Sequence, residues 1–370
     1  MQKFLYITDQ DENTDHSFIG PLFEKYLNKH FDINIIYFSK TKTSFENQNN
    51  TKFIIPNDSK NEVISQLESN GINLDDYAYI TVRNDTTILQ DVIKQRSTHK
   101  YKVGFRLSFP KRIAKLQIDE ANNKTSFIDI ISNKIQTYKE TSLINECDIF
   151  LPTSRQMRDD YLKDVKTRTF VIPSAIDPDV MHHNIHHEGN EKRFFYAGTL
   201  DKLREFETVL KAFSQIDTSK FKLMISTKDP EYAKEMFTKY PQLDDAIEVY
   251  EAKTKQELLK VIAKADIGLA ALPNIELFNS STPMKILDYY SSAIPCVMTN
   301  NENNRSIFTD NTSGWLCEFT EDDIKEKLEY IINLTKDEVT EVGENGQKRL
   351  LDVRNYERIA ADLAHQLNIL

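Results

Sequence analysis

The chain has 370 residues, of which 39% are hydrophobic and 28% charged, and its formal net charge at pH 7 is −10. This composition predicts a folded protein of two domains, and its acidity argues against a nucleic-acid partner. No apolar run approaches the roughly 20 residues that cross a bilayer, and the first residues turn acidic too early for a signal peptide. The three cysteines lie far apart, which predicts buried thiols in a reducing, cytoplasmic setting: Cys147, Cys296 and Cys317.

Strand and helix patterns alternate through the first half of the chain. Apolar runs predict strands at 3–9, 33–39, 52–56, 77–82, 101–107, 147–152 and 169–177. Amphipathic patterns predict helices between them at 17–31, 59–70, 86–96, 129–146 and 153–162. This alternation is typical of a parallel sheet covered by helices.

A polar segment without periodicity follows at 178–192 and predicts a linker. It contains four of the eight histidines, but no cysteine or group of carboxylates completes a metal-ligand set. We therefore expect a solvated linker rather than a metal site at His182, His183, His186 and His187.

The alternation restarts after the linker. Strands are expected at 193–200, 221–227, 246–252, 266–273, 295–299 and 314–319, and helices at 205–216, 231–240, 255–265, 283–293 and from 321 to 370. The whole pattern predicts an α/β protein of two doubly wound, Rossmann-like domains, with ligands at the carboxyl ends of the strands and in the cleft between the domains. The expected divisions are an N-terminal domain at 1–180, a linker at 181–192, a C-terminal domain at 193–352, and a helix at 353–370 that packs back on the N-terminal domain.

A basic stretch lies in the otherwise balanced first half. Residues 94–124 hold nine basic side chains against two acidic ones. One interpretation is a solvated face. The other is a docking surface for an anionic substrate or an anionic membrane leaflet, to which each basic residue adds about 1 kcal/mol.

Two segments of the second half carry candidate binding residues. In "AGTLDKLRE", residues 197–205, Gly198 allows close backbone approach to a ligand, and Lys202 or Arg204 offers a counter-charge for a phosphate. A strand–loop–helix segment with a glycine and a basic residue is by itself only weak evidence for a phosphate-binding site.

The second segment is "STPMKILDY", residues 281–289, which reads as a polar turn leading into a helix. The N–H groups of a helix start favour an anion, and here they belong to Ser281, Thr282, Met284 and Lys285. Asp288, one turn later, either accepts two hydroxyls of a ribose or is an ordinary helix-surface carboxylate.

Together these segments resemble the nucleotide-sugar half of retaining glycosyltransferases of the GT-B fold, family 4. "AGTLDKLRE" is similar to the family's Gly-Arg-Leu…Lys-Gly passage, with Gly198 retained, Thr199 at the arginine position and Arg204 at the lysine position. "ILDYYSSAIPCV" is similar to the passage around the second family glutamate, with Asp288 in its place. The first glutamate falls on Ser280, and Glu276 from a shifted loop is the alternative.

The resemblance extends more loosely to the first half. "CDIFLPTSRQMRDDYL" and "VIPSAID" are similar to the family's passage there, whereas its Gly-Gly loop is replaced by a segment with the single Gly20. "STPMKILDY" is also close to a variant found in bacterial polysaccharide transferases.

The resemblance implies a retaining transfer from a nucleotide-diphosphate sugar to a glycan or lipid-linked acceptor, in the cytoplasm or at the inner face of the membrane. Arg204 and Lys285 would hold the diphosphate without a metal cofactor, and Asp288 would bind the ribose. Tyr250 would lie near the base, and Arg106 with Ser108 near an anionic acceptor. Two alternatives remain: a catalytically inactive GT-B-like subunit that recognises the acceptor, and a sugar-nucleotide epimerase.

Overall fold

The computed structural model describes residues 1–12, 18–181, 189–228 and 230–370, and the chain divides into two compact units. Unit 1 comprises Met1–Pro173 together with Tyr356–Leu370, and unit 2 comprises Ser174–Asn355. The four histidines of the predicted linker fall at 182–188, outside the described residues. The last residue of that predicted linker, Lys192, is the first residue of a strand.

Unit 1 contains a seven-stranded sheet in the order β3-β4-β2-β1-β5-β6-β7. Neighbouring strands are parallel, except that β3 pairs antiparallel with β4 at the edge. Without β3, the chain order across the sheet is that of a dinucleotide-binding fold, with its switch point between β1 and β5. The strands are β1 Lys3–Asp11, β2 Asp32–Ser39, β3 Glu46–Gln48, β4 Lys52–Pro56, β5 Tyr77–Arg83, β6 Lys102–Leu107 and β7 Ile149–Pro152.

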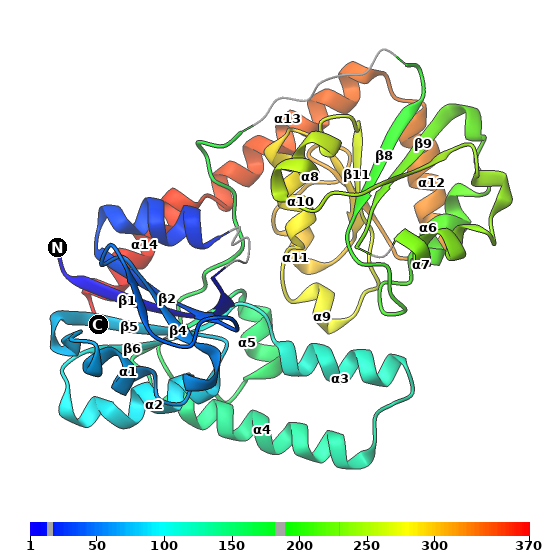
Figure 1. The fold of residues 1–370 in the computed structure, drawn as a ribbon. Coiled ribbons are helices and arrows are strands. Elements are labelled where there is room, and N and C mark those ends of the chain that lie inside the picture. The colour runs from blue at the N-terminus through cyan, green and yellow to red at the C-terminus, as the bar shows by residue number, and fades with distance from the viewer. Residues whose placement is uncertain (13–17, 182–188, 229) are drawn as a thin grey trace. The chain divides into compact units, whose positions relative to one another are not determined.

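Helices surround this sheet and complete unit 1 (Figure 1). The α-helices are α1 Val63–Ser69, α2 Thr86–Gln95, α3 Lys111–Ala121, α4 Phe127–Asn145, α5 Arg155–Tyr161 and α14 Tyr356–Asn368. Short 3₁₀ turns are η3 Asn57–Ser59, η4 Leu74–Asp76 and η5 Arg96–Thr98.

The first helix of unit 1 differs from the predicted one. It is a π-helix, η1 Ile19–Tyr26, followed by a 3₁₀ turn, η2 Leu27–Lys29. The apolar pattern predicted the buried side of this segment but not its hydrogen-bond spacing, because the wider turn still buries the same four side chains: Ile19, Leu22, Phe23 and Tyr26. Helix α14 packs against η1, so the last helix covers the first one (Figure 1).

Two further predictions for unit 1 are wrong. No strand forms over 169–177, which contains two isolated bridges, Phe150 with Thr169 and Ile176 with Asn355. Conversely, α3 forms where no helix was expected. Ala114 is its one buried residue, so the helix lies mostly at the surface.

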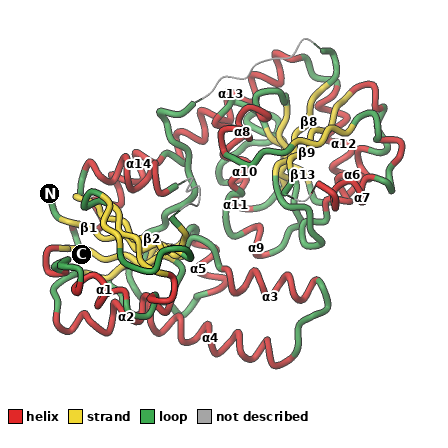
Figure 2. The backbone as a smooth tube through the Cα atoms, viewed as in Figure 1, coloured by secondary structure: helices red, strands yellow, loops and turns green. Residues whose placement is uncertain are grey.

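Unit 2 contains a six-stranded, fully parallel sheet in the order β10-β9-β8-β11-β12-β13. This is the same order as in unit 1, and the switch point lies between β8 and β11. Figure 2 shows each sheet as a layer with helices around it. The strands are β8 Lys192–Ala197, β9 Phe221–Ser226, β10 Ile247–Tyr250, β11 Ile267–Ala270, β12 Cys296–Thr299 and β13 Trp315–Cys317.

The helices of unit 2 cover both faces of its sheet. They are α6 Phe206–Phe213, α7 Pro230–Phe237, α8 Lys255–Ile262, α9 Glu276–Asn279, α10 Met284–Ser291, α11 Glu302–Arg305, α12 Glu321–Ile332 and α13 Lys336–Val353, with 3₁₀ turns η6 Thr218–Lys220 and η7 Pro241–Leu243.

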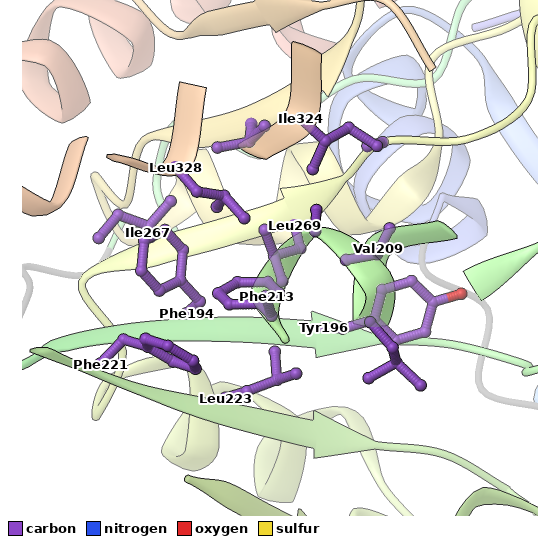
Figure 3. Close-up of a cluster of buried hydrophobic side chains, with 14 of the residues drawn as sticks. Phe194, Tyr196, Val209, Phe213, Phe221, Leu223, Ile267, Leu269, Ile324 and Leu328 are labelled. Carbon is purple, nitrogen blue, oxygen red and sulfur yellow. The ribbon is translucent and has the colours of Figure 1, made fainter. Parts of the chain in front are cut away.

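Successive residues of β8 pack into opposite layers of unit 2, as the pleat of a strand requires. Phe194 lies among side chains of α6 and α12, and its ring centroid is 5.2 Å from that of Phe213 (Figure 3). Phe195 lies on the other face among side chains of α10, including Tyr289. The prediction of two doubly wound α/β domains is confirmed.

Candidate functional site

The site begins where β8 ends, beside the switch point of the unit 2 sheet. Gly198 follows the strand with φ +146°, a conformation that L side chains rarely adopt. A Cβ atom there would lie 3.3 Å from Nζ of Lys285 and 3.6 Å from its Cε. The backbone angle therefore favours glycine at this position, and a side chain there would also crowd the end of Lys285.

Lys285, in the first turn of α10, is half-buried, and its ammonium nitrogen is shielded from solvent. Its Nζ lies 3.7 Å from the centroid of the Tyr196 ring and has no hydrogen-bond partner among the described residues. Burial, together with the nearby charge of Arg204, lowers the pKa of Lys285 to about 7. An ammonium group has three donors, and leaving them unsatisfied away from water is costly. An anion beside Gly198 would satisfy these donors.

Arg204 supplies a second cation close enough to affect Lys285. Its guanidinium forms an ion pair with Asp201, and its backbone N–H donates to Oδ1 of the same carboxylate at 2.9 Å. The guanidinium carbon also lies 5.6 Å from the centroid of the Phe278 ring. These contacts hold Arg204 in place, and its side chain remains 29% exposed.

Two helices that start at this site lack side-chain caps. Neither α6 nor α10 has a side-chain hydrogen bond at its N-cap, which is Glu205 in one and Pro283 in the other. By contrast, α8, α11, α12 and α13 are each capped by a threonine or asparagine side chain. The first N–H groups of α6 and α10 are therefore open to a ligand, and the helix dipole favours an anionic one.

The loop before α10 differs in detail from the prediction. The helix begins at Met284, so Ser281 and Thr282 lie in the loop rather than at the helix start. Thr282 is buried, and its Oγ1 accepts a hydrogen bond of 3.0 Å from Nδ2 of Asn303. Ser280 is also buried, and its Oγ donates to the Leu277 carbonyl oxygen at 3.0 Å. The other candidate carboxylate, Glu276, is exposed at the start of α9.

Asp288 is not a free helix-surface carboxylate. It forms an ion pair with Lys255, the first residue of α8, and its side chain is 13% exposed. The sequence analysis missed Lys255. Its position directly after the N-cap of a predicted helix was the available signal, but nothing in the sequence indicated which carboxylate it meets.

Tyr250 and Thr199 lie at the ends of two different strands. Tyr250 ends the edge strand β10, and its hydroxyl donates to Oε2 of Glu248 at 2.5 Å. Burial and this hydrogen bond raise the pKa of Tyr250 to about 12. Thr199 follows Gly198, and its carbonyl oxygen accepts a hydrogen bond of 3.0 Å from the Tyr196 hydroxyl. This bond also fixes the ring against which Lys285 packs.

Arg106 lies in unit 1 and is 3% exposed. One terminal nitrogen donates to the Leu151 carbonyl oxygen at 2.9 Å, whereas Nε has no hydrogen-bond partner within the described ranges. Burial lowers the pKa of Arg106 to about 10. Ser108 is hydrogen-bonded to Asn84 through both its N–H and its hydroxyl.

Unit 1 also contains a pocket of about 330 Å³ between α2, α4 and the segment that leads into α3. It is lined by apolar side chains together with three cations and one carboxylate, namely Lys111, Arg112, Lys139 and Glu140. Arg106 is not among the lining residues. In the part of the chain that the structure describes, no three His, Cys, Asp or Glu side chains gather as a metal-ion site.

Comparison with known proteins gives a family match for the second half of the chain and a shared fold for the whole of it. Residues 179–349 match the family model of glycosyl transferases group 1. The protein is a glycosyltransferase with the GT-B fold. The matched region of this glycosyltransferase contains Gly198, Arg204, Lys255, Lys285 and Asp288. No curated protein has a significant sequence match to the chain.

Solved structures of low sequence identity share the fold of the glycosyltransferase over its whole length. Sucrose-phosphate synthase from Thermosynechococcus elongatus superposes with a TM-score of 0.74 at 12% identity, covering 100% of this chain and 99% of that one. A UDP-forming trehalose-phosphate synthase from Burkholderia vietnamiensis gives 0.71 at 10% identity, with both chains fully covered. Anabaena HepE, solved in complex with UDP and glucose, gives 0.67 at 12% identity, also with full coverage.

Proposed function

We propose that the protein transfers a sugar, with retention of anomeric configuration, from a nucleotide-diphosphate sugar to an anionic glycan or lipid-linked acceptor. The proposal places this reaction at the cytoplasmic face of the membrane, in the synthesis of a surface polysaccharide or glycoconjugate. Retention and the relation to family 4 rest on the motifs around Gly198 and Asp288. A structural neighbour that binds UDP and glucose supports a nucleotide-sugar donor.

The observation that carries the donor assignment is the buried ammonium of Lys285, which has no hydrogen-bond partner among the described residues. In the proposal, the diphosphate lies against Gly198 and accepts hydrogen bonds from Lys285, Arg204 and the open N–H groups of α10. As the bond to the sugar breaks, negative charge grows on the terminal phosphate. Preorganised cations and helix amides stabilise that charge more than they stabilise the bound donor, so they accelerate the step. The proposal assigns this role to these groups rather than to a metal ion.

The nucleoside would extend from the diphosphate toward α8. There Asp288 would accept hydrogen bonds from the ribose hydroxyls, held in position by its ion pair with Lys255. Tyr250, at the end of β10, is proposed to lie near the base.

The acceptor is proposed to bind unit 1. The mixed pocket beside α3 combines apolar walls with Lys139 and with Lys111 and Arg112, which are ion-paired with Asp9 and Glu140 and would re-pair with a phosphorylated or acidic acceptor. Arg106, buried close to the carboxyl edge of the same sheet, would add positive charge to this region.

One observation favours the alternative of an inactive acceptor-recognising subunit. Ser280 stands at the position of the family's first glutamate, and its buried hydroxyl is hydrogen-bonded within its own turn. In the active enzyme, the exposed Glu276 would have to contact the transferred sugar instead.

A thermal-shift screen with UDP, GDP and ADP sugars, followed by a hydrolysis assay, tests the proposal. One nucleotide family should stabilise the protein by about 2.7 kcal/mol at a hundredfold excess over Kd. Slow donor hydrolysis that is lost in Glu276→Gln would identify an active transferase, whereas donor binding without turnover on any acceptor would favour the inactive subunit. Stabilisation by none of the nucleotide sugars would overturn the transferase assignment and the donor site at Lys285.

A further inference from the structure

Helices α3 and α4 form a hairpin whose polar sides face each other. Arg112 of α3 donates to the Asn133 carbonyl oxygen at 3.0 Å, to Oγ1 of Thr137 at 2.9 Å and to Oε2 of Glu140 at 2.9 Å. These three residues of α4 therefore point toward α3. Figure 1 shows the two helices side by side, extending from the rest of unit 1.

The opposite side of α4 carries an exposed apolar stripe. The exposed fractions are 75% for Phe127, 76% for Ile128, 43% for Ile131, 52% for Ile135 and 77% for Tyr138. At 3.6 residues per turn these five side chains fall within an arc of about 100°, on the side away from the residues that bind Arg112. Helix α4 is thus inverted relative to an ordinary surface helix, which buries its apolar side and exposes its polar one.

A contiguous exposed apolar patch of this kind marks a docking surface. The surrounding charges indicate what docks there. Lys134 and Lys139 are exposed and border the stripe on its two sides, and Lys124 precedes it. The acidic residues of α4, Asp129 and Glu140, lie on the opposite side of the helix.

We propose that the α3–α4 hairpin docks on an anionic lipid bilayer, with this stripe of α4 buried at the level of the headgroups. An apolar face bordered by lysines is the pattern of helices that lie in a membrane interface. The aromatic residues Phe127 and Tyr138 lie at the two ends of the stripe, and aromatic side chains favour this region of a bilayer. A second copy of the chain fits less well, because a symmetric pair of stripes would bring lysines together without carboxylates to oppose them.

The hairpin also changes how the basic stretch at 94–124 is interpreted. Four of its nine cations are engaged within the fold. Arg96 pairs with Asp148, Lys111 with Asp9 and Arg112 with Glu140, while Arg106 is buried. The stretch as a whole is not the docking surface. Lys124 remains exposed just before the stripe, whereas Lys115 is exposed near Asp129, on the side of α4 opposite the stripe.

Flotation of the full chain with vesicles of phosphatidylglycerol and phosphatidylcholine in equal parts tests the inference, with pure phosphatidylcholine vesicles as the reference. The wild type should float with the anionic vesicles. Replacement of Ile128, Ile131 and Ile135 by serine should reduce the bound fraction at least tenfold. Lys134→Glu combined with Lys139→Glu should remove the preference for anionic lipid. A matched control replaces three exposed apolar residues elsewhere by serine, at Tyr232, Tyr330 and Val353, and should bind like the wild type.

This inference rests on the membrane contact of the proposed function and assigns that contact to α4. Because the flotation assay needs neither donor nor acceptor, the docking inference and the proposed transferase function can fail independently. Circular dichroism and nucleotide binding verify that the variants are folded. A wild type that does not float with anionic vesicles would overturn the inference, as would a serine variant that floats equally well. A lipid-free dimer in sedimentation equilibrium that the serine variant abolishes would also overturn it, because it would assign the stripe to a second copy.

Discussion

Lys285 combines two properties that conflict in the free protein. It is charged by nature, yet its ammonium group is buried against Tyr196 with no hydrogen-bond partner in the described structure. Such a group opposes folding and favours ligand binding, since the same missing contacts that destabilise it are those that an anion supplies. Stability and donor affinity should therefore respond in opposite directions when Lys285 is changed.

Lys285→Met tests this directly. The substitution keeps a long side chain over the Tyr196 ring but removes the ammonium group. We expect the melting temperature of the ligand-free protein to stay equal or rise, while Kd for the donor increases roughly 10- to 150-fold, the equivalent of about 1.5–3 kcal/mol for a contact to a charged group. Calorimetric titration and thermal melting measure the two effects. An unchanged donor affinity would remove Lys285 from the diphosphate site.

The pKa of Lys285 predicts the pH dependence of donor binding. Because that pKa is about 7 in the free protein, the cationic form becomes scarce above neutral pH. Binding of a diphosphate favours the cation, so Kd should rise up to tenfold per pH unit above pH 7, with proton uptake on binding. In Lys285→Met, this rise of the donor Kd with pH and the proton uptake on binding should both be absent. A wild-type affinity independent of pH between 7 and 9 would contradict the assignment.

The lowered pKa of Lys285 also determines whether the stability of the ligand-free protein rises or falls with pH. The folded-state pKa lies below the ordinary value of 10.5, so between these values the unfolded chain binds more protons than the folded one. The free energy of unfolding of the ligand-free protein should therefore rise with pH across this window, and should rise less in Lys285→Met. Urea titrations of both proteins at several pH values measure the difference.

At the scale of elements, the ion pair between Lys255 and Asp288 connects the start of α8 to the middle of α10. If Asp288 binds ribose in the geometry that Lys255 holds, Asp288→Asn should weaken nucleotide binding, while Asp288→Glu should largely keep it. Lys255→Ala should weaken nucleotide binding less than Asp288→Asn does. In the double variant, Lys255→Ala should add little to the loss of affinity caused by Asp288→Asn. A double-mutant cycle on nucleotide Kd measures this coupling. Fully additive losses would show that the two residues act separately.

The elements show which features the sequence predicts. The strands of both sheets follow from apolar runs, and Gly198 and Lys285 follow from turn chemistry and motif spacing. Lys255, by contrast, meets Asp288 from a helix more than thirty residues away in the chain, and no local pattern encodes that contact. Helix α3 was missed because little of it is buried: Ala114 and Ile113 are its contacts with the core, and the hydrogen bonds of Arg112 hold it to α4. Periodicity detects burial, and it fails where polar groups form the interface.

At the scale of the whole molecule, the two units share one strand order but differ in how the chain enters them. Unit 2 is a single continuous segment, whereas unit 1 needs α14 from the far end. In α14, the Leu367 carbonyl oxygen accepts a hydrogen bond of 2.9 Å from the Tyr79 hydroxyl, and Glu357 pairs with Lys29 at 2.8 Å. The helix also buries an apolar face against η1, formed by Tyr356, Ile359, Ala360, Leu363 and Leu367.

Deletion of 356–370 should therefore destabilise unit 1 and leave unit 2 folded. Hydrogen exchange should show lost protection in β1 and η1, whereas β8 and β11 keep theirs. Donor binding should persist, because Gly198, Arg204 and Lys285 all belong to unit 2. Equal loss of protection in both sheets would indicate that the two units unfold as one.

The return of α14 to unit 1 also has a consequence for how the protein is made. On the ribosome, every residue of unit 2 emerges before α14 does, although unit 1 began first. The half that starts synthesis is thus the half that finishes folding last, and its η1 helix lacks its cover while unit 2 is translated. A chain released early by a stop codon in the last helix would carry a complete unit 2 together with an uncovered apolar surface on unit 1, which chaperones and proteases recognise.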